Sequence, residues 1–188
     1  DSNLVQYWFG EAFSELHPQL QELHLHGGRL QGDVDLDFGK GLAAVIGHRL
    51  AKRLGMPLQA GRHVLQVDIQ HKDNALYWSR CFDQQHTVTS IFKPLGNYPS
   101  GFWLEKTGPV VLKLTVDILD HDWHWRVLRA SIWGLPLPMI LFPKSRAYKK
   151  IVDDQYEFHV SFSMPRLGTL LCYQGRLTMA PSNAGDIK

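Results

Sequence analysis

Apolar and polar residues alternate along most of this chain with the two-residue period of β-strands. The clearest pair of segments spans residues 110–118 and 123–133, which are joined by a short polar turn and predict one long hairpin. Similar alternation, interrupted by turns, continues to Leu177. Because long antiparallel strands coil, we expect a strongly curved antiparallel sheet or barrel of about eight or nine strands.

Two segments have helical periodicity instead. Apolar residues recur at helical spacing over residues 4–25, and Pro18 is expected to break this helix in two. Residues 39–54 form a second amphipathic segment, which ends before Gly55. This segment follows the first strand, over residues 30–38. The sequence therefore predicts an α+β fold class, with N-terminal helices and one helix inserted after the first strand.

Composition indicates one globular domain. The 188 residues are 44% hydrophobic and 20% charged, which is enough apolar material for a sizeable core. We expect this domain to span residues 1–179, followed by a flexible polar tail at 180–188. The formal charge is only +2, and no basic run is interleaved with aromatics, so a nucleic-acid partner is not expected.

The expected location is the cytoplasm. No apolar stretch reaches the roughly 20 residues of a transmembrane helix, so no transmembrane segment is predicted, and the first residues lack a signal pattern. Cys81 and Cys172 lie far apart and outside any Cys-x-x-Cys motif, which favours free, half-buried thiols in a reducing compartment.

The segment from Trp133 to Pro143 is almost wholly apolar and contains three prolines. Proline lacks an amide hydrogen and fixes φ, so we do not expect this segment to sit inside a paired strand or a helix. Its hydrophobicity favours contact with an apolar surface rather than water. We expect it to form a lid or rim over an apolar cavity.

Arginines on apolar strand faces are the main candidates for ligand contacts. If the alternation holds, Arg80 shares a face with Trp78, and Arg129 shares one with Trp125. An arginine facing a barrel interior must be paired or must bind an anion, because burying it alone is very costly. Two alternatives stay open, a structural bridge to Glu105 or an anionic ligand. The expected ligand-binding residues are Trp78, Arg80, Trp103, Glu105, Trp125, Arg129, Trp133 and Tyr173.

Other groups of polar residues do not match the spacing of a metal, nucleophile or cofactor site. The acidic run Asp33–Asp37 lacks the spacing of a calcium loop, and the histidines do not follow a recognised zinc pattern, so no metal is expected. Cys81 and Ser161 lie on predicted strands without the exposed turn of a nucleophile. No Gly-x-Gly-x-x-Gly fingerprint is present, so no cofactor and no catalytic residue are assigned.

A series of short motifs runs through most of the chain. They are Gly39-Lys-Gly41-Leu42 with Gly55-Met-Pro57, Trp78-Ser-Arg80-Cys-Phe82, Gly101 with Glu105 and Gly108-Pro109, Trp133-Gly-Leu-Pro-Leu-Pro138 with Pro143, and Phe158-x-Val160 with Pro165, Gly168, Tyr173, Gly175 and Leu177. In order and combination this series resembles the bacterial domain of unknown function 4166. The resemblance implies an NAD-binding partner domain similar to saccharopine dehydrogenase, because members of that family often follow one. It does not imply a reaction.

These observations favour a noncatalytic module that binds a hydrophobic small molecule, acidic or lipid-like, in a barrel-like cavity. The alternative is a structural or docking domain with a filled core, attached to a larger oxidoreductase or to a second copy of the chain. An internal cavity of roughly 300 Å³ or more would favour the first hypothesis, and a flat exposed apolar patch the second. An enzymatic role would need a histidine or carboxylate beside Arg80 in a cleft, and we expect no catalysis by this domain alone.

Overall fold

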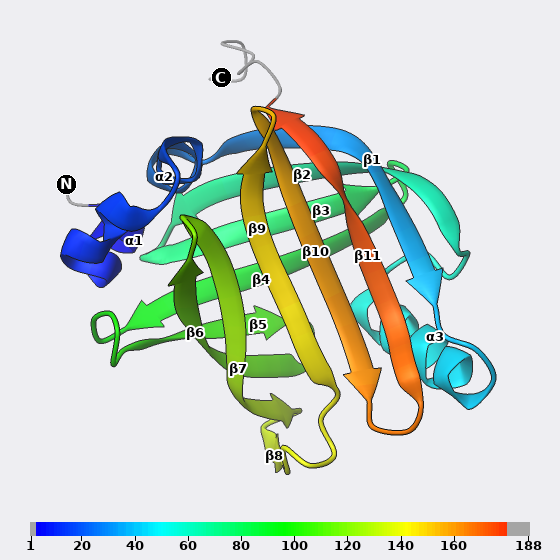
Figure 1. Cartoon of the computed structure of the whole chain (residues 1–188). Coiled ribbons are helices and arrows are strands. Elements are labelled where there is room, and N and C mark those ends of the chain that lie inside the picture. Colours follow the sequence, from blue (N-terminus) through cyan, green and yellow to red (C-terminus); the bar gives the residue numbers. More distant parts are fainter. Residues whose placement is uncertain (1–2, 180–188) are drawn as a thin grey trace.

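Ten antiparallel strands close into a barrel in the computed structural model, which describes residues 3–179 (Figure 1). The tail expected at 180–188 lies outside the described residues. Around the barrel the strands follow the order β6-β5-β4-β3-β2-β1-β11-β10-β9-β7, and β7 pairs back onto β6. Their bounds are β1 (Gly28–Phe38), β2 (Gly61–Lys72), β3 (Ala75–Phe82), β4 (His86–Leu95), β5 (Phe102–Thr107), β6 (Val110–Leu119), β7 (Asp122–Ile132), β9 (Lys144–Val152), β10 (Gln155–Met164) and β11 (Gly168–Met179).

The barrel prediction is confirmed, although the strand count is higher than the eight or nine expected. An eleventh strand, β8 (Leu135–Leu137), pairs with β7 outside the barrel. It contains Pro136, which lies opposite Ser131, so the expectation that the proline segment would not pair was wrong. A proline is tolerated there because β8 is an edge strand, whose outer amides need no partner.

Tight turns connect several of the hairpins. Two-residue turns with positive φ at both positions join β2 to β3 and β6 to β7, and Trp133–Gly134 joins β7 to β8 in the same way. Aspartate at the first turn position, as in Asp73–Asn74 and Asp120–His121, tolerates this left-handed conformation. The twist of such turns matches that of the strands, so they fix the strand register.

Helices lie at two separate places on the barrel (Figure 1). The N-terminal segment consists of α1 (Leu4–Phe9), the 3₁₀ turn η1 (Gly10–Glu15) and α2 (Pro18–His26). The expected break at Pro18 is present, and a second break at Gly10 makes the segment three short pieces. The inserted helix, α3 (Leu42–Leu54), follows β1 as predicted and packs on β11. No helix within residues 3–179 is long and apolar enough to cross a bilayer.

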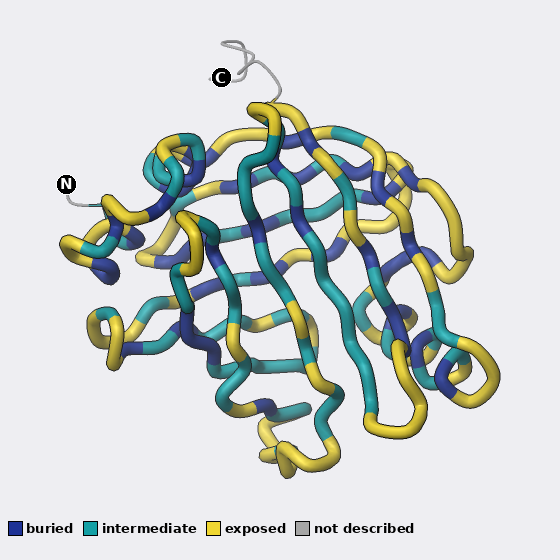
Figure 2. Tube along the Cα trace, in the orientation of Figure 1, coloured by how far each residue is buried: buried dark blue, intermediate teal, exposed yellow. Residues whose placement is uncertain are grey.

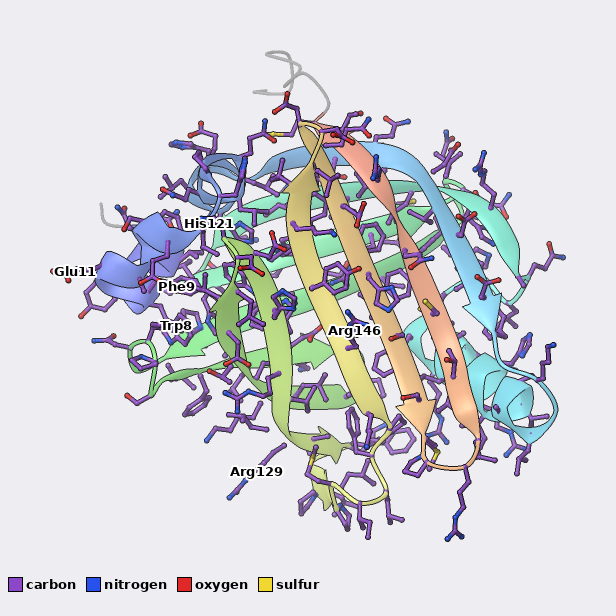
Figure 3. All side chains as sticks on the ribbon, in the orientation of Figure 1. Trp8, Phe9, Glu11, His121, Arg129 and Arg146 are labelled. Carbon is purple, nitrogen blue, oxygen red and sulfur yellow. The ribbon has the colours of Figure 1, made fainter. Side chains whose placement is uncertain are left out.

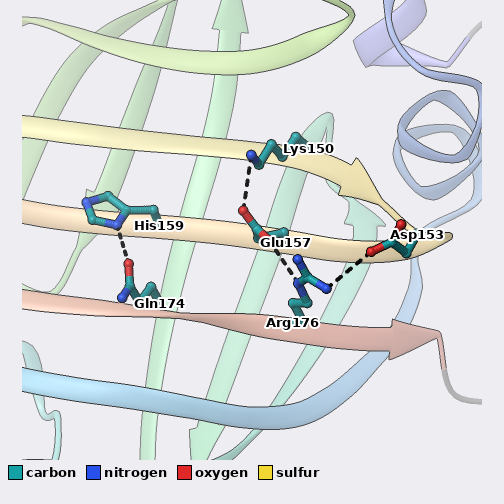
Figure 4. A network of polar contacts seen from close by, with 6 residues as sticks. All are labelled: Lys150, Asp153, Glu157, His159, Gln174 and Arg176. Carbon is teal, nitrogen blue, oxygen red and sulfur yellow. Dashed lines mark hydrogen bonds and ion pairs between the residues drawn. The ribbon is translucent and has the colours of Figure 1, made fainter.

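The buried residues line the barrel interior and the inner sides of the helices (Figure 2). Aromatic side chains from α1 and η1 close one end of the barrel. There the ring centroid of Trp8 lies 5.4 Å from that of Trp103, and the centroid of Phe9 lies 4.9 Å from that of Trp123. On the outer face, β9 to β11 carry an ion-pair network (Figure 4). In it, Glu157 contacts both Lys150, at 3.2 Å, and Arg176, at 2.9 Å.

One barrel seam is much shorter than the others. Strands β7 and β9 pair only where Trp123–Trp125 meets Ala147–Lys149. Further along the same edge of β7, Ala130–Ile132 pairs with β8 instead of β9. Between these two ladders β7 contains a bulge, because Val127 lies opposite Leu114 while Arg129 lies opposite Lys113, which leaves Leu128 as the extra residue.

Replacing Gly47 by alanine should destabilise the fold. A Cβ at this position of α3 would overlap the backbone carbonyl oxygen of Leu170 on β11. Helix propensity alone favours alanine by about 1 kcal/mol, whereas overpacking costs about 1–3 kcal/mol, so we expect a net loss in the free energy of unfolding measured in urea. Arg49→Ala, at an exposed position of the same helix, is the control and should change it by less than about 0.5 kcal/mol. A stabilised Gly47→Ala variant would contradict the close helix–strand contact.

Candidate functional site

The barrel encloses a cavity of about 230 Å³ at the end opposite the aromatic cluster. Leu50 and Leu54 of α3 line it on one side, and Leu137 and Phe142 of the proline segment line it on the other. The wall between them is predominantly apolar. Among the wall residues are Met56, Trp78, Phe82, Phe92, Leu112, Trp125, Val127, Phe158, Val160 and Phe162.

A short chain of hydrogen bonds runs along the cavity wall across β3, β4 and β5. Arg80 Nη1 donates to Ser90 Oγ at 2.9 Å, and Ser90 Oγ lies 2.6 Å from Thr107 Oγ1. Thr107 in turn donates to Glu105 Oε1 at 3.2 Å. The guanidinium therefore reaches the carboxylate through two hydroxyls rather than through the direct bridge considered from the sequence.

Lys149 is a buried amine on the opposite wall. It lies on β9 with only 4% of its surface exposed, and it also lines the cavity. Its Nζ lies 3.9 Å from the ring centroid of Trp123, 4.4 Å from that of Trp78 and 5.6 Å from that of Trp125. Among the described residues, no carboxylate oxygen forms an ion pair with it.

The direct polar partner of Lys149 is His24, which lies on α2 and is fully buried. The two nitrogens, Lys149 Nζ and His24 Nε2, are 2.5 Å apart. His24 Nδ1 lies 2.7 Å from the carbonyl oxygen of Leu20, which can only accept. The Nδ1 atom must therefore carry the ring proton, so Nε2 is free to accept a hydrogen bond from the lysine amine.

The surroundings of Lys149 and His24 favour the uncharged form of each side chain. Burial lowers the pKa of Lys149 well below its ordinary value, and the charge of Arg80 lowers it further, while Glu105 acts in the opposite direction. Burial and the neighbouring Lys149 lower the pKa of His24 in the same way. The indole faces attract an ammonium by up to about 2 kcal/mol when desolvated, which offsets only part of the several kcal/mol of a full burial penalty.

Two tyrosines complete the polar side of the cavity. Tyr156 and Tyr173 both line it and are buried. Burial raises the pKa of each phenol above its ordinary value, although Arg80 acts against the shift. Both hydroxyls therefore stay protonated at neutral pH and can donate a hydrogen bond to a ligand.

Five of the eight residues expected to bind a ligand line this one cavity, namely Trp78, Arg80, Glu105, Trp125 and Tyr173. The structure brings them together from β3, β5, β7 and β11. Trp103 does not reach the cavity, because it is fully buried in the aromatic cluster with Trp8. The other two residues, Arg129 and Trp133, lie outside.

The expected inward orientation of Arg129 was wrong. Trp123, Trp125 and Val127 face inward as the alternation predicted, but the bulge at Leu128 shifts the alternation by one residue. Arg129 therefore points into solvent, away from the barrel (Figure 3).

The expected place of Trp133 in the lining was also wrong. It occupies the first position of the β7–β8 turn, with φ of 51°, and 70% of its surface is exposed. Its ring lies 5.6 Å from the guanidinium carbon of Arg53, at the end of α3. This cation–π contact links the proline segment to α3 at the rim of the cavity.

Sequence reasoning missed Lys149 and His24. Lys149 falls in a short basic stretch, residues 144–150, whose composition is typical of a solvent-exposed strand. Strand alternation does indicate that Lys149 faces inward, because residues two positions apart lie on the same face of a strand and its neighbours at this spacing, Ala147 and Ile151, are apolar. Nothing in the local pattern of α2 distinguishes His24 from its exposed neighbour His26. Among residues 3–179, no three His, Cys, Asp or Glu side chains gather as metal ligands.

A protein-family model described as domain of unknown function (DUF4166) matches residues 16–177. The chain belongs to this family. The match covers every barrel strand up to Leu177 together with α2, α3 and both walls of the cavity, and it confirms the resemblance seen in the motifs. No curated protein matches the chain.

Lys149→Met should change how stability depends on pH. Because the pKa of the folded-state amine is lowered, the unfolded chain binds more protons, so the free energy of unfolding rises with pH until it reaches the pKa of a free amine, about 10.4. The slope approaches about 1.4 kcal/mol per pH unit where only the unfolded form is protonated.

Urea titrations between about pH 7 and about pH 10 should show this slope in the native protein but not in Lys149→Met. The control is Lys150→Met, whose amine points outward and pairs with Glu157 at 3.2 Å. Its pH dependence should match that of the native protein. Equal slopes in the native protein and Lys149→Met would mean that the buried amine keeps its proton at neutral pH.

Proposed function

We propose that this domain binds a small hydrophobic molecule that carries an oxygen-containing polar group. The observation that supports this is the predominantly apolar cavity, whose lining includes a few polar side chains, among them Arg80, Glu105 and Lys149. Cavities with this composition are typical of small-molecule sites, in which apolar walls supply affinity and a few polar groups fix the orientation.

The buried polar groups also favour a site over a filled core. Desolvating an arginine or a lysine is costly whether the group keeps its charge or loses its proton, and a core that serves only stability gains nothing from placing Arg80 and Lys149 in one apolar chamber. Arg80 is held in place by its bond to Ser90 and by the ring of Trp78, 6.0 Å away. A preorganised guanidinium of this kind binds a carboxylate or another electron-rich oxygen well.

The volume limits the ligand. At about 230 Å³ the cavity is smaller than the roughly 300 Å³ expected for a ligand module. A compact aromatic or short aliphatic molecule fits this size better than a long fatty chain. Longer ligands would need the rim to open, and the rim is where Trp133 rests on Arg53.

The proline segment supports a second candidate function. Trp133, Leu135 and Ile140 expose 70%, 72% and 88% of their surfaces. Clustered exposed apolar side chains mark interaction surfaces, so docking on a second copy of the chain or on an NAD-binding domain is the alternative. The ligand hypothesis is preferred because Leu137 and Phe142 of the same segment line the cavity.

Arg80→Met should weaken binding of an acid but not of the matching alcohol. We expect 3-phenylpropionate to lose roughly tenfold or more in affinity, since a hydrogen bond to a charged group contributes about 1.5–3 kcal/mol. Binding of 3-phenylpropanol should change by less than about threefold, because it depends on the apolar wall. Both can be measured by isothermal titration calorimetry or tryptophan fluorescence.

The matched control is Arg129→Met, which removes an arginine from the outer face and should affect neither ligand. Unfolding curves would check that Arg80→Met remains folded. If neither the acid nor the alcohol binds the native protein, the ligand hypothesis is wrong for this chemical class. Equal weakening of both by Arg80→Met would mean that the arginine supports the wall rather than the ligand.

Removing the exposed side chains should separate docking from binding. If the segment docks onto a second copy, the double change Leu135→Ser and Ile140→Ser should reduce self-association in analytical ultracentrifugation and leave 3-phenylpropanol binding intact. A monomeric native protein at all concentrations would contradict docking between copies of this chain.

A further inference from the structure

We propose that Lys149 forms a covalent imine with an aldehyde or ketone group of the molecule bound in the cavity. This inference rests on the proposed function, since it assigns the ligand class of the same site. It follows from the position of a single amine inside the chamber, from the histidine that contacts it, and from the tryptophans around it.

The arrangement around the amine is that of a nucleophile with a base. Lys149 Nζ lies 2.5 Å from His24 Nε2, and the bond from His24 Nδ1 to the Leu20 carbonyl oxygen holds the ring in the tautomer that accepts a proton. A nucleophile in contact with a base, which is itself oriented by a third group, is the arrangement used in covalent catalysis. Here both side chains are buried and thus fixed in position.

An amine must be uncharged to attack a carbonyl carbon. The apolar wall and the nearby Arg80 favour the neutral amine, as their effect on the pKa of Lys149 shows. Lysines desolvated in apolar pockets, or placed beside another cation, are activated in this way for imine formation. Lys149 meets both conditions.

The reaction needs no oxidant or reductant. The nitrogen lone pair attacks the carbonyl carbon, a C–N bond forms, and the carbonyl π electrons move to oxygen. His24 Nε2 accepts a proton from nitrogen and returns one to oxygen, which gives a neutral carbinolamine. The carbinolamine hydroxyl then takes up one proton from solvent and leaves as water while the nitrogen lone pair forms the C=N bond, which gives a protonated imine. Amine, carbonyl and one proton thus become protonated imine and water, and release of that proton gives the neutral imine.

The surroundings favour the product as well. A protonated imine is a cation, and the faces of Trp78, Trp123 and Trp125 lie 4.4, 3.9 and 5.6 Å from the nitrogen. Indole faces attract cations, most strongly in a site without water. The apolar lining also disfavours the water that would hydrolyse the imine.

The chain supplies a matched control for the amine. Lys150 is the next residue on β9, but its side chain points to the outer face and pairs with Glu157 at 3.2 Å. Its side chain is partly exposed to water, and its polar partner is a carboxylate rather than an imidazole. Any reaction that depends only on lysine chemistry would therefore modify Lys150 at least as readily as Lys149.

The test uses the full chain with 3-phenylpropanal and cyanoborohydride, followed by intact-mass measurement and peptide mapping. We expect one reduced adduct per chain, located at Lys149, in both the native protein and Lys150→Met, and no adduct at that stoichiometry in Lys149→Met. An excess of 3-phenylpropanol should slow the modification by competing for the cavity. His24→Gln should slow it at neutral pH while its affinity for the alcohol stays within about threefold.

The outcomes distinguish this inference from the proposed function. If the alcohol binds but the adduct is absent or spread over surface lysines, imine formation is overturned and the binding function stands. If the alcohol does not bind and no adduct forms at Lys149, both are overturned. Should Lys149→Met fail to fold, peptide mapping of the native protein still decides the site of modification.

Discussion

The barrel depends on a short seam between β7 and β9. Every other strand neighbour in the ring pairs over a longer stretch, whereas here only Trp123–Trp125 and Ala147–Lys149 meet. The side chains that face inward at this seam are large and unusual, a lysine opposite tryptophans. Closing the ring therefore places an amine in the interior. His24 of α2 and Trp123 of the aromatic cluster pack against this amine and bury it, so the residues that close the barrel also form part of the site.

Closure also decides where space remains. The aromatic side chains of α1 and η1 fill one end of the barrel, around Trp103 and Trp123. The other end is covered by α3 and the proline segment, where the exposed Trp133 lies 5.6 Å from the guanidinium carbon of Arg53. The cavity lies beneath these two covering elements, and an exposed cation–π contact such as this one is weak.

Sequence patterns predicted the fold better than the site. Strand alternation identified the barrel, the inserted helix and most of the inward row, including Arg80 and Trp78, because burial on one face of a strand is a local property. The alternation gave the wrong orientation for Arg129, because a bulge shifts the inward and outward positions by one residue. No residue type near the bulge reveals it in the sequence. The contact between Lys149 and His24 joins residues 125 positions apart, so only tertiary structure reveals it. The family match identifies a domain of unknown function and adds no chemistry.

The energetics of Lys149 favour a function for it. Desolvating an amine with no carboxylate partner opposes folding, and a leucine or methionine at this seam would pack against Trp123 without that penalty. Its neighbour Lys150 avoids this penalty in the usual way, because its side chain points outward and pairs with Glu157. Structural stability therefore does not account for an amine at position 149. The proposed imine chemistry offers an account, because the burial that opposes folding also favours an uncharged, nucleophilic nitrogen.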